Sequence, residues 1–316
     1  MTVNIAVAGT GAFGNKHLDA LRRIDDARVV AIVEPDHARA RAVAARHGIE
    51  SVAADLDEVL ERSDVDAVVL ATPTPLHAAQ AMACLRAGKH VEVEIPMCDR
   101  LADGEALVAL QAETGLVAMC GHTRRFNPSH QWVRRRIVED GFHIQQMDVQ
   151  TYFFRRTNTN AAGEPRTWTD HLLWHHAAHT VDLFLHQTSG TVVRAHAIQG
   201  PPHPELGIAM DMSIQLLVDT GAILTLSLSF NNDGPFGTFF RYIGDTGTYV
   251  ARYDDLTDGH DRPIDVSDVD VSTDGIELQD RAFVSAIRDG HEPESSVARV
   301  LPCYQVLHRI EQELAE

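Results

Sequence analysis

The sequence has few cysteines, no long apolar run and a shortage of basic residues. Its four cysteines lie far apart and form no C-x-x-C pair, which argues against a disulfide framework and favours a reducing cytoplasm. No apolar stretch approaches the roughly 18 residues of a membrane-spanning helix, and no basic region precedes the first apolar run, as a secretion signal would require. We therefore expect a cytoplasmic protein with no membrane partner.

The charge balance is strongly acidic. The chain has 27 Lys and Arg residues against 45 Asp and Glu residues, a formal net charge of −18. A surface of that sign repels phosphate backbones, so we expect no nucleic-acid partner. The apolar fraction of 44% and the charged fraction of 23% are those of an ordinary globular protein.

The 316 residues are enough for two domains. In the first part, apolar runs typical of buried strands alternate with helical patterns. We expect strands at 3–8, 29–33, 67–71, 90–95 and 116–120, and helices at 15–24, 37–47, 76–87 and 103–113. This alternation predicts a doubly wound parallel α/β sheet, as in a Rossmann domain, over residues 1–121.

The pattern changes to longer strands with polar alternation over 122–316, the second expected domain. We expect strands at 144–154, 192–198, 210–218, 222–230 and 239–253, and helices at 132–140, 171–186, 281–289 and 297–315. These elements predict a C-terminal α/β domain with a large, mostly antiparallel sheet.

A glycine-rich motif follows the first expected strand and opens a helix. It matches G-x-G-x-x-G with Gly9, Thr10, Gly11, Ala12, Phe13 and Gly14. In this setting the motif predicts a dinucleotide site, although a plain glycine turn remains an alternative. Glu34, 20 residues after Gly14, would accept hydrogen bonds from the adenosine ribose and repel a 2′-phosphate. It favours NAD over NADP, while Arg39 could still reach a 2′-phosphate.

Several further motifs occur in a fixed order. They are Thr72-Pro73, His77, Ala87-Gly88-Lys89-His90-Val91 and Glu94-Ile95-Pro96. Together they resemble the glucose–fructose oxidoreductase/inositol dehydrogenase family. The resemblance implies a Rossmann domain, an open-faced α/β domain and hydride transfer to a nicotinamide near Thr72, Pro73, His77 and Glu94.

The family's usual catalytic set is altered in this chain. That set comprises the lysine of E-K-P, then an aspartate and a histidine four residues apart on a helix. Here Ile95 replaces the lysine and His175 replaces the aspartate, while His179 is retained. Lys16 and Lys89 are the only lysines, and both fall where the dinucleotide fold uses them. We therefore expect proton chemistry by histidine, with His179 as general base and His175 beside it.

The chain also resembles one branch of this family along its whole length. The matching stretches are 122–128, 168–182, 205–212 and 231–235. The branch comprises semialdehyde dehydrogenases of protocatechuate 4,5-cleavage. The resemblance implies oxidation of a cyclic hemiacetal to a pyrone dicarboxylate with NADP or NAD. An exposed sheet face commonly invites pairing, so we expect a homo-oligomer, a dimer or a tetramer.

Helical spacing places several histidines on one face of the expected helix at 171–186. At 100° per residue, His171, His175, His179 and His186 fall with Asp182 inside an arc of about 80°. The stripe could be a solvated polar face, or a metal site, since histidines at i and i+4 can share an ion. We favour a catalytic stripe without metal, because hydride transfer needs none.

A dicarboxylate substrate requires local positive charge in so acidic a chain. Guanidinium groups bind carboxylates through paired hydrogen bonds. Arg124 and Arg125 are the first choice, although only one of two successive side chains should face the ligand. The predicted substrate contacts are Arg124, Arg125, His122, Asn127, Arg155 and Asp182.

Two other functions remain open at the level of sequence. One is a sugar-acid or polyol dehydrogenase of the same family, against which the loss of the lysine and the aspartate argues. The other is a non-catalytic dinucleotide-binding regulator. Ionisable groups cluster at working sites, and the density of histidine and arginine therefore favours an enzyme.

Overall fold

The computed structural model describes residues 2–159, 163, 165–166, 168–235 and 237–315. The chain forms two compact units, Met1–His122 with Ile276–Leu301, and Thr123–Gly275 with Pro302–Glu316. The first break between the units, after His122, lies one residue from the domain boundary expected after residue 121. The stretch Ile276–Leu301 belongs to the first unit, so neither unit is one continuous piece of chain.

The first unit is built on a six-stranded parallel sheet with the order β3-β2-β1-β4-β5-β6. This confirms the expected Rossmann-type sheet. The strands are β1 (Val3–Ala8), β2 (Ala27–Val33), β3 (Val52–Ala53), β4 (Ala67–Leu70), β5 (His90–Val93) and β6 (Ala118–Cys120). The chain order reverses between β1 and β4, where doubly wound sheets bind ligands at the carboxyl ends of their strands.

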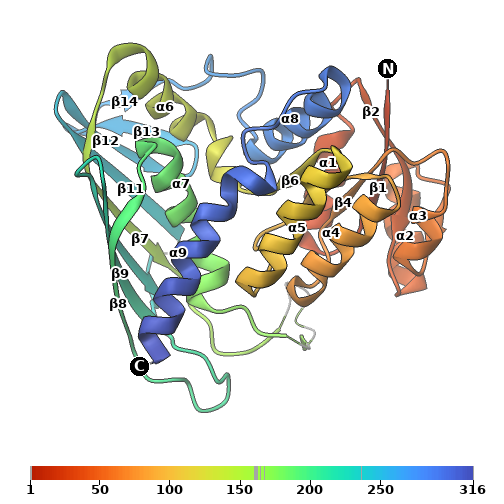
Figure 1. Ribbon diagram of the computed structural model, residues 1–316, viewed down its shortest axis with the longest axis horizontal. Coiled ribbons are helices and arrows are strands. Elements are labelled where there is room, and N and C mark those ends of the chain that lie inside the picture. Colours follow the sequence, from red (N-terminus) through yellow and green to blue (C-terminus); the bar gives the residue numbers. More distant parts are fainter. Residues whose placement is uncertain (1, 160–162, 164, 167, 236, 316) are drawn as a thin grey trace. The chain divides into compact units, whose positions relative to one another are not determined.

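Several α-helices accompany this sheet, and local sequence fixes some of their ends (Figure 1). They are α1 (Ala12–Leu21), α2 (His37–His47), α3 (Leu56–Leu60), α4 (His77–Arg86), α5 (Leu101–Thr114) and α8 (Gly275–Asp289). The side chain of Asp36 caps the start of α2 by accepting from the N–H groups of Ala38 and Arg39. Gly48 ends the same helix with φ +68°, a left-handed conformation that suits glycine.

The second unit is built on an eight-stranded sheet with the order β14-β13-β12-β11-β7-β10-β9-β8. Among the described strands of this sheet, only β7 and β10 pair in parallel and the other pairs are antiparallel, which confirms the expected mostly antiparallel sheet. The strands are β7 (Ile144–Tyr152), β8 (Val192–Gln199), β9 (Asp211–Val218), β10 (Ile223–Ser229), β11 (Gly237–Gly244), β12 (Gly247–Arg252), β13 (Asp255–Asp258) and β14 (Pro263–Ile264).

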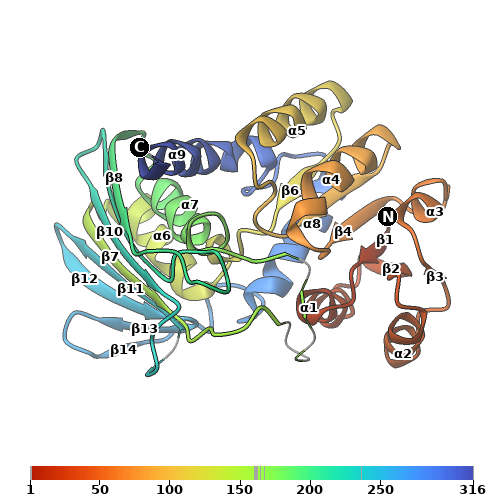
Figure 2. The ribbon, with the colours of Figure 1, turned by 90° about the horizontal axis from the view of Figure 1, so that it is seen from below.

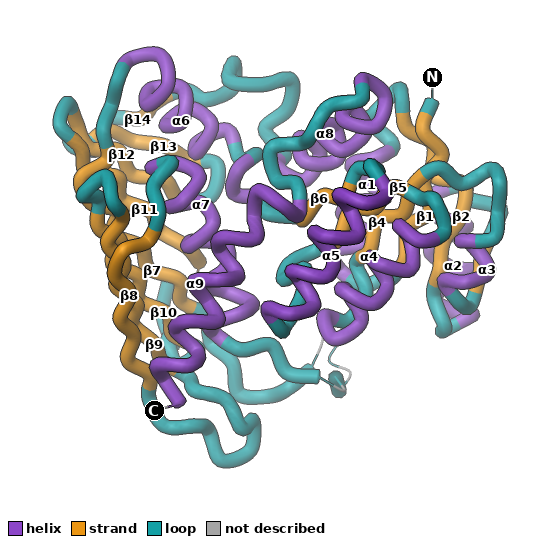
Figure 3. The backbone as a smooth tube through the Cα atoms, in the orientation of Figure 1, coloured by secondary structure: helices purple, strands orange, loops and turns teal. Residues whose placement is uncertain are grey.

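Helices cover one face of this second sheet. Figure 2 shows α6 (Pro128–Asp140), α7 (Ala178–Thr188) and α9 (Val297–Ala315) along that face. Figure 3 shows the strands of the same sheet in orange. The strands alternate accordingly: on β9, Met212, Ile214, Leu216 and Val218 are buried, whereas Asp211, Ser213 and Gln215 are exposed. No described helix of this unit lies over the opposite face.

Three features differ from the sequence-based expectation. The short elements β3, α3, β13 and β14 were not predicted. The expected strand at 239–253 is a hairpin of β11 and β12 that turns between Gly244 and Gly247. The expected helix at 171–186 begins as a π-helix over Leu172–Ala177 before α7 starts. Among the described helices, none has the length and apolarity to cross a bilayer.

Candidate functional site

The glycine turn after β1 has the geometry of a dinucleotide loop. Gly9 has φ +91°, and a Cβ there would lie 2.4 Å from the carbonyl oxygen of Ala71. A Cβ on Gly14 would lie 1.9 Å from the carbonyl oxygen of Gly9. Gly11 instead borders open space, with no described heavy atom within 4 Å of its Cβ position. Two glycines thus close the turn, and the third leaves room for a pyrophosphate at the start of α1.

The remaining residues of the predicted loop lie at the surface. Ala12 and Phe13 are exposed in the first turn of α1, Phe13 by 50%. The ammonium of Lys16 lies 4.8 Å from the centre of the Phe13 ring. These positions leave the N–H groups at the start of α1 accessible to an anion.

Glu34 lies at the end of β2 and is tied to the glycine turn. Its Oε2 accepts from the hydroxyl of Thr10 at 2.6 Å and from the Thr10 N–H at 3.2 Å. Its Oε1 accepts from the N–H of Asp36 at 3.2 Å. Arg39 lies 4.0 Å from the Glu34 carboxylate and 3.6 Å from that of Asp36. A fixed negative charge therefore stands beside the loop, with a guanidinium next to it.

Thr72, Pro73 and His77 follow β4, and His77 connects two loops. The buried His77 lies 2.8 Å through Nδ1 from the carbonyl oxygen of Pro96 and 2.7 Å through Nε2 from that of Thr72. The hydroxyl of Thr72 donates to Gln80 at 2.6 Å. Burial lowers the pKa of His77. His77 thus holds the backbones that follow β4 and β5 at the carboxyl edge of the sheet.

Glu94, just after β5, belongs to a buried ionic cluster that sequence reasoning missed. Its carboxylate lies 3.1 Å from Nε2 of His17, and Nδ1 of His17 lies 2.8 Å from Asp280. Burial alone would lower the pKa of His17, but Asp280 and Glu94 raise it well above its ordinary value. Gln279 donates to Glu92 at 2.8 Å, and burial raises the pKa of Glu92.

This cluster also meets a geometric criterion for a metal site. One potential ligand atom from each of His17, Glu92 and Asp280 lies within 4.8 Å of the others. Both ring nitrogens of His17 lie within hydrogen-bond distance of carboxylates. The cluster therefore ties Glu94, after β5, to α8.

The predicted histidines of the second unit lie on both sides of the π-to-α junction. His175 stacks on Trp168, with ring centres 5.6 Å apart and planes 17° apart. Its Nδ1 accepts from the N–H of His171 at 3.2 Å. His179 is half-buried in the first turn of α7. The wider π turn changes the angular positions of His171 and His175 relative to His179, so the angles calculated for one continuous α-helix do not apply there. The rings of His171 and His175 still lie side by side, with centres 5.0 Å apart.

Arg125 and Asp182, both predicted to contact substrate, bind each other. Nε and one terminal nitrogen of Arg125 lie 2.8 Å and 2.5 Å from the two carboxylate oxygens. The side chains are only 5% and 1% exposed. This bidentate pair joins the turn at Thr123–Arg125 to α7, and each charge is directed at the other rather than at an anion.

Arg124, Asn127 and His122 also have surroundings of their own. The Arg124 guanidinium lies 5.7 Å from the ring centre of Phe240 and 5.5 Å from that of Tyr253, and burial lowers its pKa. Asn127 donates to Asp254 at 3.1 Å. His122 is buried at the end of the first unit's continuous stretch. Arg124 is held by aromatic faces, and Asn127 joins two segments of the second unit.

Arg155 is part of a cluster centred on Asp170 in the second unit. Both terminal nitrogens of Arg155 donate to the Asp170 carboxylate, one of them at 2.7 Å. Arg166 donates to the same carboxylate at 3.0 Å, and Nε2 of His176 lies 3.5 Å away. Sequence reasoning did not assign Asp170 or His176 to a site, since no motif or periodicity marks them.

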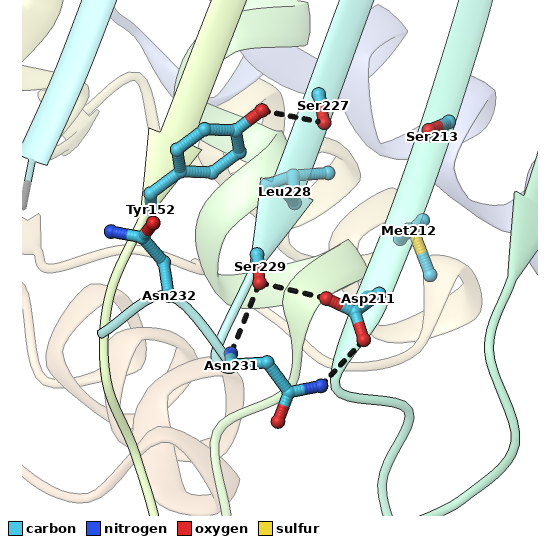
Figure 4. A pocket seen from close by; sticks show the side chains of 9 residues that line it. All are labelled: Tyr152, Asp211, Met212, Ser213, Ser227, Leu228, Ser229, Asn231 and Asn232. Carbon is cyan, nitrogen blue, oxygen red and sulfur yellow. Dashed lines mark hydrogen bonds between the residues drawn. The ribbon is translucent and has the colours of Figure 1, made fainter. Parts of the chain in front are cut away.

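A separate hollow of about 310 Å³ lies on the polar side of β7, β9 and β10. In Figure 4, Tyr152 donates to Ser227 at 3.1 Å, and Ser229 donates to Asp211 at 2.7 Å. None of the predicted substrate contacts lines it. The hollow therefore contains none of the side chains that the sequence assigns to substrate.

Comparisons with known proteins cover the whole chain. A family described as oxidoreductases with an NAD-binding Rossmann fold matches residues 3–122, and a C-terminal domain of bacterial oxidoreductases matches residues 128–270. The 4-carboxy-2-hydroxymuconate-6-semialdehyde dehydrogenase of Sphingobium sp. (strain SYK-6) is 64% identical over 312 residues, 99% of each chain. An inositol 2-dehydrogenase of Paenarthrobacter aurescens is 26% identical over 312 residues, 95% of this chain and 92% of that one.

Solved structures show the same fold at low sequence identity. The crystal structure of an oxidoreductase domain protein from Kribbella flavida superposes with a TM-score of 0.86 at 21% identity, covering 99% of this chain and 97% of that one. A scyllo-inositol dehydrogenase from Lactobacillus casei, solved with bound NAD(H) and scyllo-inositol, gives a TM-score of 0.82 at 19% identity, with coverage of 99% and 97%.

Proposed function

We propose that this chain, which belongs to the oxidoreductase family with an NAD-binding Rossmann fold, oxidises the cyclic hemiacetal of 4-carboxy-2-hydroxymuconate-6-semialdehyde. It is an NAD(P)-dependent dehydrogenase of that family. The product is 2-pyrone-4,6-dicarboxylate. Membership confirms the family expected from the motifs. The observation that carries the proposal is the 64% identity over 99% of both chains to an enzyme of that name.

The first unit supplies the dinucleotide site of the proposed enzyme. Its turn fits a dinucleotide because Gly9 and Gly14 tolerate no Cβ, whereas Gly11 opens onto free space. In the proposal, Gly9, Gly11, Ala12, Phe13 and Gly14 hold the pyrophosphate and Glu34 faces the adenosine ribose. Thr72, Pro73, His77 and Glu94 line the nicotinamide half. When bound, the nicotinamide supplies the hydride acceptor.

Histidine supplies the base in the proposed mechanism. Neither lysine replaces the missing family lysine: Lys89 donates to the carbonyl oxygens of Arg62 and Val65 at 2.6 Å and 2.8 Å. Lys16 lies over the ring of Phe13. An imidazole titrates near neutral pH, which suits a general base. His179 accepts the hemiacetal hydroxyl proton while hydride leaves the same carbon, and the C–O bond becomes the lactone carbonyl.

Two residues, one in each unit, stand where this chain departs from the family motifs. His175 is held by Trp168 and by the N–H of His171, so it is a fixed polar neighbour on the same helical segment. Ile95 gives the wall after β5 an apolar side chain where relatives place a cation. An apolar wall suits a flat conjugated ring better than a hydrated polyol. This favours the semialdehyde over inositols or sugar acids as substrate.

Cofactor choice follows from Glu34 in this proposal. Its carboxylate is oriented by three hydrogen bonds. In the proposal it faces the ribose position that carries the 2′-phosphate of NADP. Like charges repel, so NAD is preferred over NADP. Arg39 lies close enough to Glu34 to reduce that repulsion, and NADP therefore remains usable.

The test is a direct assay with chemically defined substrate. Protocatechuate opened by a 4,5-dioxygenase is offered with NAD and with NADP, and absorbance of the reduced nicotinamide is followed. The expected result is rapid reduction, with 2-pyrone-4,6-dicarboxylate identified by mass. Reduction with inositols or aldoses but not with the semialdehyde would overturn the proposal in favour of a polyol dehydrogenase.

A further inference from the structure

The second unit contains more positive charge around Asp170 than one carboxylate neutralises. Arg155 and Arg166 both donate to Asp170, which is 8% exposed. Burial would raise the pKa of Asp170, but the neighbouring His176 and the hydrogen bonds from Arg155 hold it below its ordinary value. Among the described residues of this cluster, two guanidinium groups therefore share one carboxylate anion, which leaves one surplus positive charge.

The two guanidinium groups retain donors for a second anion. Each has five N–H donors in a planar fork. Within the described part of the chain, the hydrogen bonds to Asp170 use both terminal nitrogens of Arg155 and one of Arg166. Nε of both arginines and the second terminal nitrogen of Arg166 are not used in these bonds. A carboxylate could therefore bind without displacing Asp170.

Aromatic rings hold both arginines in place. Arg155 lies 4.6 Å from the ring centre of Phe230, and Arg166 lies 5.2 Å from that of Trp168. Their side chains are 19% and 25% exposed. Preorganised and partly desolvated guanidinium groups bind a carboxylate more strongly than mobile surface arginines do.

The other candidate arginines are engaged elsewhere. Arg125 is paired with the buried Asp182, and Arg124 lies against two aromatic rings. By contrast, the Asp170 cluster adjoins the histidine segment: His176 contacts Asp170, and Trp168 contacts both Arg166 and His175. The Asp170 cluster thus contacts the helical segment that carries His175 and His176.

We propose that Arg155 and Arg166 bind one carboxylate of the dicarboxylate substrate, and that Asp170 is the positioning residue that holds them. The inference rests on the proposed function for the identity of that substrate. It assigns Arg166 and Asp170 roles that the family motifs do not contain, and it makes this cluster the source of selectivity for acids over neutral hemiacetals.

The test compares ligands that differ by one carboxylate. Binding of 2-pyrone-4,6-dicarboxylate and of its two monocarboxylates is measured by calorimetry for the full chain and for Arg166→Gln. In the wild type, loss of the recognised carboxylate should weaken binding about 10- to 100-fold. In Arg166→Gln that difference should largely disappear, with KM for the semialdehyde raised more than kcat is lowered and cofactor binding unchanged.

Arg156→Gln is the matched control. Arg156 is adjacent in sequence but donates to Asn231 and to the carbonyl oxygen of Phe230. It should keep the wild-type difference between the ligands. Asp170→Asn keeps the size of the side chain and should lose part of the discrimination between the dicarboxylate and the monocarboxylates. If this variant does not fold, the result for Arg166→Gln decides.

The two proposals fail in different ways. An active wild type whose Arg166→Gln variant still distinguishes dicarboxylate from monocarboxylates would overturn this inference alone. A wild type that neither binds the pyrone dicarboxylate nor oxidises the semialdehyde would overturn the proposed function and this inference together.

Discussion

At the scale of single residues, function depends on which ionisable side chains already form ion pairs or hydrogen bonds within the fold. Arg125 is neutralised by Asp182, and Lys89 is held by two backbone carbonyls. Glu34 is oriented by Thr10 and by the N–H of Asp36. In the functions proposed above, imidazoles of the second unit carry the proton transfer and the guanidinium groups at Asp170 carry the anion binding.

The first residue-scale prediction concerns Glu34. Replacing it by Ala removes the negative charge beside the glycine turn, so the ratio of kcat/KM for NADP to that for NAD should rise about tenfold or more. Steady-state kinetics with each cofactor measures this ratio. Arg39→Gln is the opposing variant and should lower it. An unchanged ratio in both variants would show that neither side chain selects the cofactor.

The second concerns Gly11, which has φ −66° and no described neighbour around its Cβ position. Gly11→Ala should fold with near-normal stability but bind dinucleotide at least about tenfold more weakly, because the methyl group occupies the approach of the pyrophosphate. Fluorescence titration and thermal melting separate the two effects. Gly14→Ala, whose Cβ would meet the carbonyl of Gly9, should lose stability as well. Normal dinucleotide affinity in Gly11→Ala would contradict the assigned loop.

At the scale of elements, the parallel sheet was predictable because its strands are continuous apolar runs between helical patterns. The four residues of β4 are all buried, which produces that signal. The two-residue β3 is too short to leave a pattern. The π-helix was not predictable either. The buried Trp174 within it donates to Glu311 at 2.8 Å, 137 residues away, and such contacts do not appear in local periodicity.

The residues of the candidate site also differ in whether a local sequence pattern predicts them. The glycine loop and Glu34 were predictable because one local motif carries them. The Asp170 cluster was not, because it gathers residues from a loop and a π-helix around one carboxylate. The partners of His17 were hidden in the same way, since Asp280 lies 263 residues further along the chain. Sequence spacing placed the histidines on one helical segment but did not give their angular arrangement.

The element-scale prediction concerns the ion pair between α7 and the turn at Thr123–Arg125. Asp182→Ala leaves a buried guanidinium without its bidentate partner and should destabilise the second unit by about 3–5 kcal/mol. Urea denaturation followed by tryptophan fluorescence measures this change. The double variant Arg125→Met with Asp182→Leu should recover most of the loss. A change below about 1 kcal/mol in Asp182→Ala would show that the pair is not structural.

At the scale of the whole molecule, the chain carries a net charge of −18, and some of its acidic side chains are buried in the first unit. There His17 lies between Glu94 and Asp280, with Glu92 close by. The raised pKa of His17 means that its contribution to stability is complete below about pH 6.5 and is lost as pH rises through its folded pKa. The raised pKa of Glu92 acts in the same direction.

The whole-molecule prediction is a stability that falls towards alkaline pH. Glu92→Gln has no charge to develop, so its urea midpoint should decline less than that of the wild type between pH 5 and pH 9. Each unit of pKa difference removed corresponds to about 1.4 kcal/mol. The exposed Glu105 provides a control, and Glu105→Gln should keep the wild-type slope. Parallel curves for Glu92→Gln and wild type would refute the assignment.

The most direct measurement for the account as a whole is a single-turnover assay of His179→Ala with the semialdehyde and saturating dinucleotide. Formation of the pyrone dicarboxylate should slow by about 10²–10⁴-fold, while dinucleotide affinity stays at the wild-type value. Turnover within a few-fold of the wild type would contradict the account, because proton removal would then not depend on this imidazole.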